Sequence, residues 1–146
     1  MNEMLKFAAI TCAVAAVPAS AIADAATKDF VVNAVTELFI EGDVEAIDRY
    51  WAEDYIQHNP MFPSGRGVIK DLFGNMPPSF KYEMGMVIAD DDLVAIHARY
   101  TGLGPKPLVA VDIFRVEDGR IAEHWDILQE EVQETASGVP MFEPMQ

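Results

Sequence analysis

The most constraining stretch of this sequence is a predicted β-hairpin at residues 111–126, in which ionisable side chains alternate with apolar ones. Its two arms, VDIFRV and RIAEHWD, contain many β-branched and aromatic residues, and residues 117–119 (Glu-Asp-Gly) separate them. Burying an ionisable group costs free energy unless the group is paired or hydrogen-bonded. We therefore expect these strands to line a cavity in which their polar groups act.

The register of this hairpin decides which side chains can meet. We expect residues 117–119 to form a three-residue loop closed by its glycine, which adopts positive φ without steric cost. That loop would pair Val116 with Arg120 and place Asp112 opposite His124. A two-residue loop would shift the parity and separate the aspartates. One predicted face carries Ala110, Asp112, Phe114, Ala122, His124, Asp126 and Leu128, and the other Val109, Val111, Ile113, Ile121, Trp125 and Ile127.

The length and charge of the chain limit its partners. At 146 residues it is long enough for one domain with a sizeable core. Ten Lys plus Arg against 24 Asp plus Glu give a net charge of −14. Such a chain repels phosphate backbones and anionic membranes, so we expect neither nucleic acid nor membrane as a partner, and a neutral small molecule fits better.

The first residues resemble a secretory leader. Residues 7–17 form an apolar run, and Ser20-Ala21-Ile22-Ala23 ends in an Ala-x-Ala cleavage pattern. We expect residues 1–23 to be a signal peptide and the mature protein to be periplasmic or secreted, although a disordered or amphipathic extension is an alternative. Cys12, the only cysteine, lies inside the leader, so the mature protein would have no thiol chemistry.

Helices are expected before strands. Apolar spacing predicts helices that begin at Thr27, at Asp43 and at Val68, and a short strand at residues 55–58 that ends at Asn59-Pro60. Four further strands are expected over residues 80–89, 93–100, 108–116 and 120–128. This order predicts an α+β domain over residues 24–128, a cone-shaped curved antiparallel sheet with the N-terminal helices packed on its concave face. Residues 129–146 are expected to be a largely irregular tail.

Several of these segments resemble one family. The motifs are Tyr55-Ile56-Gln57-His58-Asn59-Pro60, His97-Ala98-Arg99-Tyr100-Thr101-Gly102, Val111-Asp112-Ile113-Phe114-Arg115 and Asp118-Gly119-Arg120-Ile121-Ala122-Glu123-His124-Trp125-Asp126. In this order they resemble the SnoaL-like polyketide cyclases of the nuclear transport factor 2-like superfamily. The resemblance covers nearly all of residues 27–128 and implies the cone fold, which is also called cystatin-like. Proteins with this fold have several different activities, so the fold alone does not predict which reaction this protein catalyses.

The resemblance implies roles for particular residues. Asp126 matches the general acid/base of the cyclases, which catalyse an intramolecular aldol condensation, and Asp112 matches a polar partner on the preceding strand. Ketosteroid isomerases of the superfamily place their base where this chain has Asn59, and an amide cannot abstract a proton. Epoxide hydrolases would need arginine at Ala110.

The polar residues then suggest a chemistry. An apolar cavity penalises a charged carboxyl, so of two neighbouring aspartates one would stay protonated while the other acts as a base. The alternatives are a strand-end cap, an ion pair with Arg99 or Arg115, and a purely structural hydrogen bond from His124. A metal site formed by the three histidines finds no support in their local spacing. Our predicted catalytic residues are Asp126, Asp112, His58 and His97, and our predicted substrate-binding residues are Asn59, His124, Tyr55, Trp51, Phe114 and Arg99.

The sequence therefore predicts an exported, cofactor-independent and metal-free enzyme that transfers a proton on a carbonyl substrate, by aldol cyclisation or isomerisation. One alternative is a non-catalytic binding protein for a small hydrophobic ligand, and another is a dimerisation module. The apolar reverse face, with Ile113, Trp125 and Ile127, has no helix left to cover it. We expect a homodimer through this face.

Overall fold

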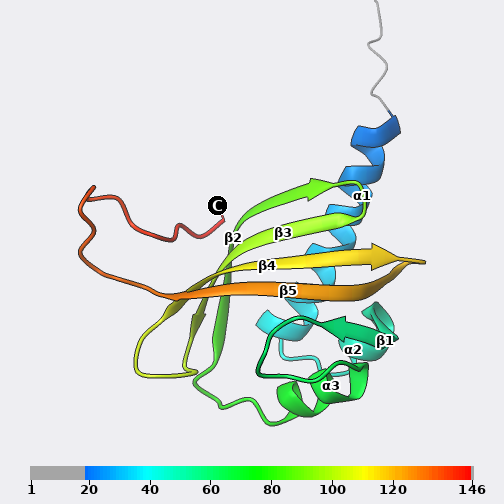
Figure 1. Cartoon of the computed structure of the whole chain (residues 1–146), viewed down its shortest axis with the longest axis horizontal. Coiled ribbons are helices and arrows are strands. Elements are labelled where there is room, and N and C mark those ends of the chain that lie inside the picture. Colours follow the sequence, from blue (N-terminus) through cyan, green and yellow to red (C-terminus); the bar gives the residue numbers. More distant parts are fainter. Residues whose placement is uncertain (1–18, 146) are drawn as a thin grey trace, which may run out of the picture.

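A computed structural model describes residues 19–145, with side chains from Asp24 onward, as a helical layer against one curved, open sheet (Figure 1). In chain order the elements are α1 (Ala19–Val35), η1 (Thr36–Ile40), α2 (Ala46–Tyr50), β1 (Trp51–Gln57), α3 (Arg66–Gly74), β2 (Lys81–Asp90), β3 (Leu93–Thr101), β4 (Leu108–Glu117) and β5 (Arg120–Glu130). The predicted α+β class with helices on one face of a curved sheet is confirmed. No helix among the described residues is long and apolar enough to cross a membrane.

The first helix begins earlier than Thr27, the residue at which we expected it to start. Residues 19–26 are mostly alanine, the strongest helix former, and they continue the helix back to Ala19. At its other end the helix widens into the π-turn η1 and stops before Gly42, whose φ of 73° ends it as expected. The expected leader, apart from residues 19–23 in α1, lies outside the described residues.

The sheet has the order β1-β5-β4-β3-β2. Strands β2 to β5 form the predicted antiparallel meander, in which each strand pairs with the next along the chain. The first strand, β1, lies parallel to β5, the last one (Figure 1). This long-range pairing brings residues 57–59 beside residues 123–126, and the sequence pattern did not predict it.

The hairpin turn differs from our prediction. Glu117 pairs with Arg120, so the loop has two residues, Asp118 and Gly119, with φ of 50° and 70°. Positive φ at both positions is the type I′ geometry that Asp-Gly favours, because its twist matches that of the strands. The expected pairing of Val116 with Arg120 is therefore wrong.

A β-bulge compensates for the shorter loop. The pairing passes from Val116↔Ile121 to Arg115↔Glu123, which leaves Ala122 as the extra residue. Beyond the bulge Asp112 lies opposite Asp126, not opposite His124 as expected. Ile121, which we assigned to the reverse face, is fully buried in the core instead.

The core lies between the helices and the inner face of the sheet. Val31, Val35 and Leu38 from the helical layer pack against the alternate residues Val94 and Ile96 of β3. This arrangement removes water from the inner face, on which the polar groups of β4 and β5 also lie. Burial there is favourable for the apolar residues and demands a partner for every polar one.

The tail after β5 folds back over the outer face of β2 and β3 (Figure 1). Phe142 is buried, its ring 5.6 Å from that of His97, with the Arg99 guanidinium 5.0 Å above it. The Met145 amide donates to the Met84 carbonyl at 2.8 Å. The tail is irregular in its backbone, as expected, and it covers part of the reverse face.

Candidate active site

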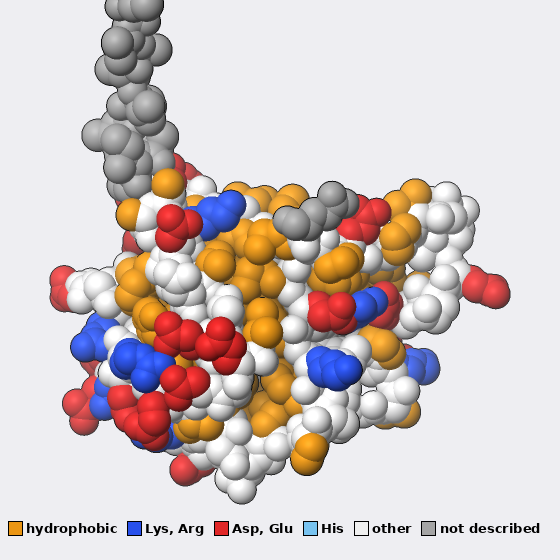
Figure 2. All heavy atoms as spheres, turned by 180° about the vertical axis from the view of Figure 1, so that it is seen from behind, with side chains coloured by type: hydrophobic (Ala, Val, Ile, Leu, Met, Phe, Trp, Pro, Cys, Tyr) orange, Lys and Arg blue, Asp and Glu red, His pale blue; other side chains and the backbone are white. Residues whose placement is uncertain are grey.

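A cavity of about 140 Å³ opens between the inner face of the sheet, α3 and the loops beside them. Apolar and aromatic side chains make up most of its wall. Figure 2, which shows the molecule from the side opposite to Figure 1, has hydrophobic side chains gathered through the middle and charged side chains on both sides of them, more densely at the left. The lining residues include Phe39, Trp51, Tyr55, Phe73, Phe80, Tyr100 and Phe114, and the polar Gln57, Asn59, His124 and Asp126. An apolar cavity with a few converging polar groups is the usual form of a small-molecule site.

The polar end of the cavity consists of two tripeptides that lie side by side. Residues 57–59 (Gln-His-Asn) begin at the last residue of β1, and residues 124–126 (His-Trp-Asp) lie on β5. Each residue contacts its counterpart: a ring nitrogen of His124 lies 3.1 Å from the Gln57 oxygen, His58 stacks on Trp125, and Asn59 donates to Asp126. The parallel pairing of β1 with β5 therefore assembles the site.

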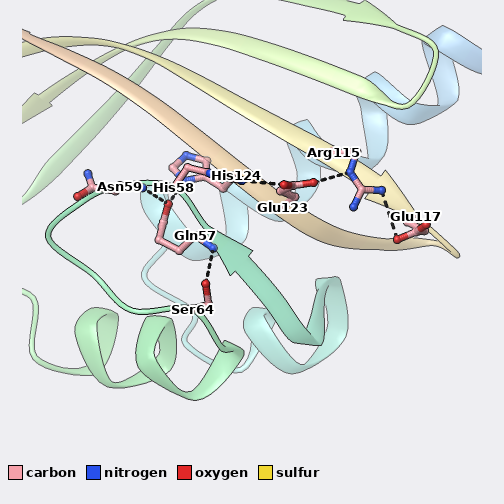
Figure 3. A network of polar contacts seen from close by, with 8 residues as sticks. All are labelled: Gln57, His58, Asn59, Ser64, Arg115, Glu117, Glu123 and His124. Atoms are coloured by element: carbon pink, nitrogen blue, oxygen red, sulfur yellow. Dashed lines mark hydrogen bonds and ion pairs between the residues drawn. The ribbon is translucent and has the colours of Figure 1, made fainter.

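Gln57 is the hub of this arrangement (Figure 3). Its Oε1 accepts the backbone N–H of Asn59 at 3.0 Å, and its Nε2 donates to the Tyr55 hydroxyl at 3.2 Å. A backbone N–H can only donate, so it fixes which end of the amide is the oxygen. The same oxygen lies 3.1 Å from His124 Nδ1, which must therefore carry a hydrogen.

Behind the cavity wall, Asp112 is a fully buried carboxylate. The hydroxyls of Tyr82 and Tyr100 donate to its two oxygens, each at 2.9 Å. Burial, followed by the nearby charge of Asp112, raises the pKa of both tyrosines well above the usual value, so both hydroxyls stay protonated and donate. Asp112 is thus satisfied by the protein and does not line the cavity.

His124 connects this buried aspartate to the cavity. Its Nε2 is buried without a hydrogen-bond partner and lies 3.4 Å from Asp112 Oδ1. Because Nδ1 already carries a hydrogen, a neutral ring would turn a bare lone pair toward a carboxylate, which is repulsive. The two side chains are close enough to interact electrostatically, and no hydrogen bond joins these two atoms.

Asp126 is the acid that faces the cavity. It is half-buried, lines the pocket and accepts the Asn59 amide at 2.6 Å through Oδ2. Asn59 is itself held in place, because its Oδ1 accepts the Met61 backbone N–H at 2.8 Å. The second carboxylate oxygen has no protein hydrogen bond among the described residues and is available to a ligand.

Three side chains at the polar end lie close enough together to be considered as metal ligands. One ligand atom from each of Asp112, His124 and Asp126 lies within 4.8 Å of the others. The hydroxyls of two tyrosines occupy both oxygens of Asp112, and the Asn59 amide occupies one oxygen of Asp126. These hydrogen bonds would compete with a metal ion for the same oxygens.

Three predicted site residues lie on the other side of the sheet. His58 stacks on Trp125 and contacts Glu123 at 2.7 Å, on the outer face (Figure 3). His97 and Arg99 lie beneath the tail, against Phe142. The structure thus separates His58 and His97 from the predicted catalytic aspartates, and it separates Arg99 from the predicted substrate-binding residues.

The ion pairs of the outer face explain these positions. Arg115 contacts Glu123 at 2.8 Å and Glu117 at 3.3 Å, and Arg99 contacts Glu83 at 2.7 Å. The hydrogen bonds from His58 and Arg115 hold the pKa of Glu123 below its usual value. Neither predicted alternative partner, Arg99 or Arg115, forms an ion pair with Asp112 or Asp126 among the described residues.

The remaining predicted binding residues surround the cavity: Asn59, His124, Tyr55, Trp51 and Phe114. Sequence reasoning missed Gln57, Tyr82 and Tyr100. Tyr100 shares the inner face of β3 with Ile96 and Ala98, so period-two alternation could have indicated it. Gln57 was part of a quoted motif, but only the pairing of β1 with β5 explains its role.

Known proteins support the fold. Among solved structures, TsrD from Streptomyces laurentii matches with a TM-score of 0.60 and 18% identity over 72% of this chain and 90% of that chain. A proposed ketosteroid isomerase from Kribbella flavida matches with a TM-score of 0.63 and 20% identity over 75% of this chain and 82% of that chain. IdmH, a proposed polyketide cyclase from Streptomyces antibioticus, matches with a TM-score of 0.56 and 23% identity over 70% of this chain and 91% of that chain. No curated protein matches this sequence.

At these identities the solved structures establish the fold and nothing finer. The family model of the SnoaL-like domain matches residues 15–124, which is most of the chain. The match contains the tripeptide at residues 57–59, the buried Asp112 and the first residue of the second tripeptide. By this match, and by the open curved sheet that supports it, the chain is a member of the SnoaL-like domain family.

Proposed function

We propose that this protein is a cofactor-independent enzyme that moves a proton on the carbon next to a carbonyl group, in an aldol-type or isomerisation reaction. The observation that carries the proposal is Asp126, a carboxylate with one free oxygen at the polar end of an apolar cavity. Such an oxygen is suited to act as a general base. The names of two structural neighbours, a polyketide cyclase and a ketosteroid isomerase, are consistent with this class.

The supporting residues would have distinct roles. Asn59 holds Asp126 through one amide hydrogen and has a second for the oxygen of an enolate. Asp112, which accepts the hydroxyls of Tyr82 and Tyr100 and lies 3.4 Å from His124, would influence the base only from behind the cavity wall. This differs from our expectation that Asp112 contacts the substrate, since it lies behind the wall.

The decisive experiment uses hydrogen–deuterium exchange at the α-carbon of a panel of carbonyl compounds in D₂O. Asp126→Asn should lower the exchange rate by about 10² to 10⁴, the usual contribution of a general base. Asp54→Asn, which changes an exposed acid on β1, should leave the rate unchanged. An undiminished rate in Asp126→Asn would remove the proposal.

A binding protein for a small hydrophobic ligand is the second candidate, because most of the cavity wall is apolar. Ligand binding without exchange in any member of the panel would favour it. A cavity of this size also argues against a module that serves only dimerisation.

Homodimerisation and export also remain proposals. The outer face carries Ile127, which is 65% exposed, beside Trp125, Ile113 and Leu93, and an open groove of about 400 Å³ runs between them. A second copy of the chain would cover this patch. Export is supported by the apolar residues 7–17, and cleavage after Ala23 would leave α1 to begin close to Thr27.

A further inference from the structure

We infer that Asp112, His124 and Asp126 together form a binding site for one Zn²⁺ ion at the polar end of the cavity. This site departs from the metal-free protein that the sequence predicts, and it does not depend on the proposed reaction. Four features of the described residues carry the argument: an imidazole nitrogen without a partner, the distances between the ligand atoms, the hydrogen bonds that support each ligand, and the charge balance of the cavity.

The nitrogen without a partner is Nε2 of His124. The side chain is only 8% exposed, and this nitrogen has no hydrogen-bond partner among the described residues. The other ring nitrogen donates its hydrogen to Gln57, so in a neutral ring Nε2 has a lone pair, and Asp112 Oδ1 lies 3.4 Å from it. A lone pair buried beside a carboxylate is repelled by it, and a cation bound between the two atoms removes that repulsion.

The distances suit a tetrahedral metal ion better than a hydrogen bond. A proton between His124 Nε2 and Asp112 Oδ1 would draw them to about 2.7–3.2 Å, the usual distance for N–H···O. Zn²⁺ binds nitrogen and oxygen at about 2.0–2.2 Å, so its tetrahedral ligand atoms lie about 3.3–3.6 Å apart, which includes the 3.4 Å separation of these two atoms.

Asp126 supplies the third ligand. One of its carboxylate oxygens lies within 4.8 Å of the ligand atoms of Asp112 and His124. The side chain is half-buried and lines the cavity, so a rotation about its own bonds can bring this oxygen to the ion. The fourth position of the ion would then open on the cavity, from which the ion would enter.

Each ligand already has a hydrogen bond of the kind that orients metal ligands. Gln57 accepts the hydrogen of His124 Nδ1 and thereby leaves Nε2 as the atom that binds a metal. Hydrogen bonds also orient the two carboxylates, from Tyr82 and Tyr100 to Asp112 and from Asn59 to Asp126. A carboxylate oxygen has two lone pairs, so an oxygen that accepts one of these hydrogen bonds keeps a second lone pair for the ion.

The charge balance favours a divalent ion. Asp112 is fully buried, Asp126 is half-buried, and no lysine or arginine is among the residues that line the cavity. Two carboxylates so close together in an apolar environment repel each other strongly, and a charge of 2+ between them cancels both. Mg²⁺ and Ca²⁺ prefer six or more oxygen ligands, whereas Zn²⁺ accepts imidazole and carboxylate in a four-coordinate site.

Calorimetric titration of the chelator-treated full chain with Zn²⁺ tests the inference. We expect one Zn²⁺ per chain, which an excess of Mg²⁺ does not displace. Asp126→Asn and His124→Gln should each weaken binding by about 100-fold or more, and Gln57→Met, which removes only the support of the imidazole, by about 10- to 100-fold. His58→Gln on the outer face and Asp54→Asn at an exposed position on β1 are the matched controls and should leave binding unchanged.

Two measurements keep the test valid if the buried His124→Gln variant fails to fold. Asp126→Asn alters a half-buried cavity residue, and its fold is checked by circular dichroism. In the unmodified protein, Zn²⁺ should shift the ¹⁵N signal of His124 Nε2 and leave the hydrogen on Nδ1. No Zn²⁺ binding, binding that Asp126→Asn leaves unchanged, binding that His58→Gln abolishes, or an unshifted Nε2 signal would each overturn the inference.

The site and the proposed function can fail separately. Zn²⁺ binding is measured without any carbonyl compound, and exchange at the α-carbon is measured in chelator-treated protein. The ion would occupy the carboxylate that the proposed reaction uses as a base, so Zn²⁺ should slow the exchange in a protein that has both properties. Exchange that saturating Zn²⁺ leaves undiminished would overturn the metal site and leave the proposed function standing.

Discussion

His124 has a different neighbour at each of its ring nitrogens. Gln57 Oε1 accepts from Nδ1, and Nε2 lies 3.4 Å from Asp112 Oδ1. The orientation of Gln57 is fixed in turn by a backbone N–H, so a main-chain group determines the tautomer of a side chain two contacts away. Gln57 is therefore a positioning residue for the His124 ring.

This arrangement predicts an NMR result. In ¹⁵N-labelled protein, the Nδ1 of His124 should carry a hydrogen, and Gln57→Met should remove that preference because the acceptor is lost. His58 and His97 lie on the outer face and serve as internal controls, with spectra that the substitution leaves in place. An Nδ1 without a hydrogen in the unmodified protein would contradict the hydrogen bond from His124 to Gln57.

At the scale of elements, period-two alternation was sufficient to predict strands β2 to β5 and the side of the sheet on which Asp112 lies. It failed at the bulge, because Ile121 and Ala122 are both apolar and either could have faced inward. It also failed for the partner of β1, since that pairing joins residues 67 positions apart, as Gln57 and His124 show. Local patterns carry no information about such contacts, which is why Gln57 was missed.

The tail packs closely on β2, and this packing predicts that alanine substitution at two glycines has opposite effects on the free energy of unfolding. A Cβ at Gly85 would lie 2.8 Å from the Glu143 carbonyl oxygen, 2.9 Å from Phe142 and 2.9 Å from the His97 carbonyl oxygen of β3, so Gly85→Ala should destabilise the protein by about 1–3 kcal/mol. At Gly67, in α3, a Cβ meets nothing within 4 Å, and Gly67→Ala should stabilise by up to about 1 kcal/mol.

Urea unfolding measures both free energies, and limited proteolysis shows whether the tail of Gly85→Ala has left the sheet. Equal effects of the two substitutions would contradict the close packing of Gly85 against the tail and β3.

At the scale of the whole molecule, the outer face is divided between the tail and the exposed patch around Trp125. If a second copy covers this patch, Ile127→Lys should place a charge in the interface and shift the protein to a monomer in analytical ultracentrifugation. Val139→Lys, a change at an exposed position in the tail, is the matched control. A monomeric unmodified protein, or a dimer that survives Ile127→Lys, would contradict the proposed interface.

The parallel pairing of the first strand with the last has a consequence for synthesis. The two tripeptides at the cavity lie on strands at opposite ends of the sheet-forming sequence, so a nascent chain has no site until β5 has left the ribosome. Closing so long a loop is entropically costly, and contacts of this kind slow folding. The binding competence of this protein should therefore be among the last properties that it acquires.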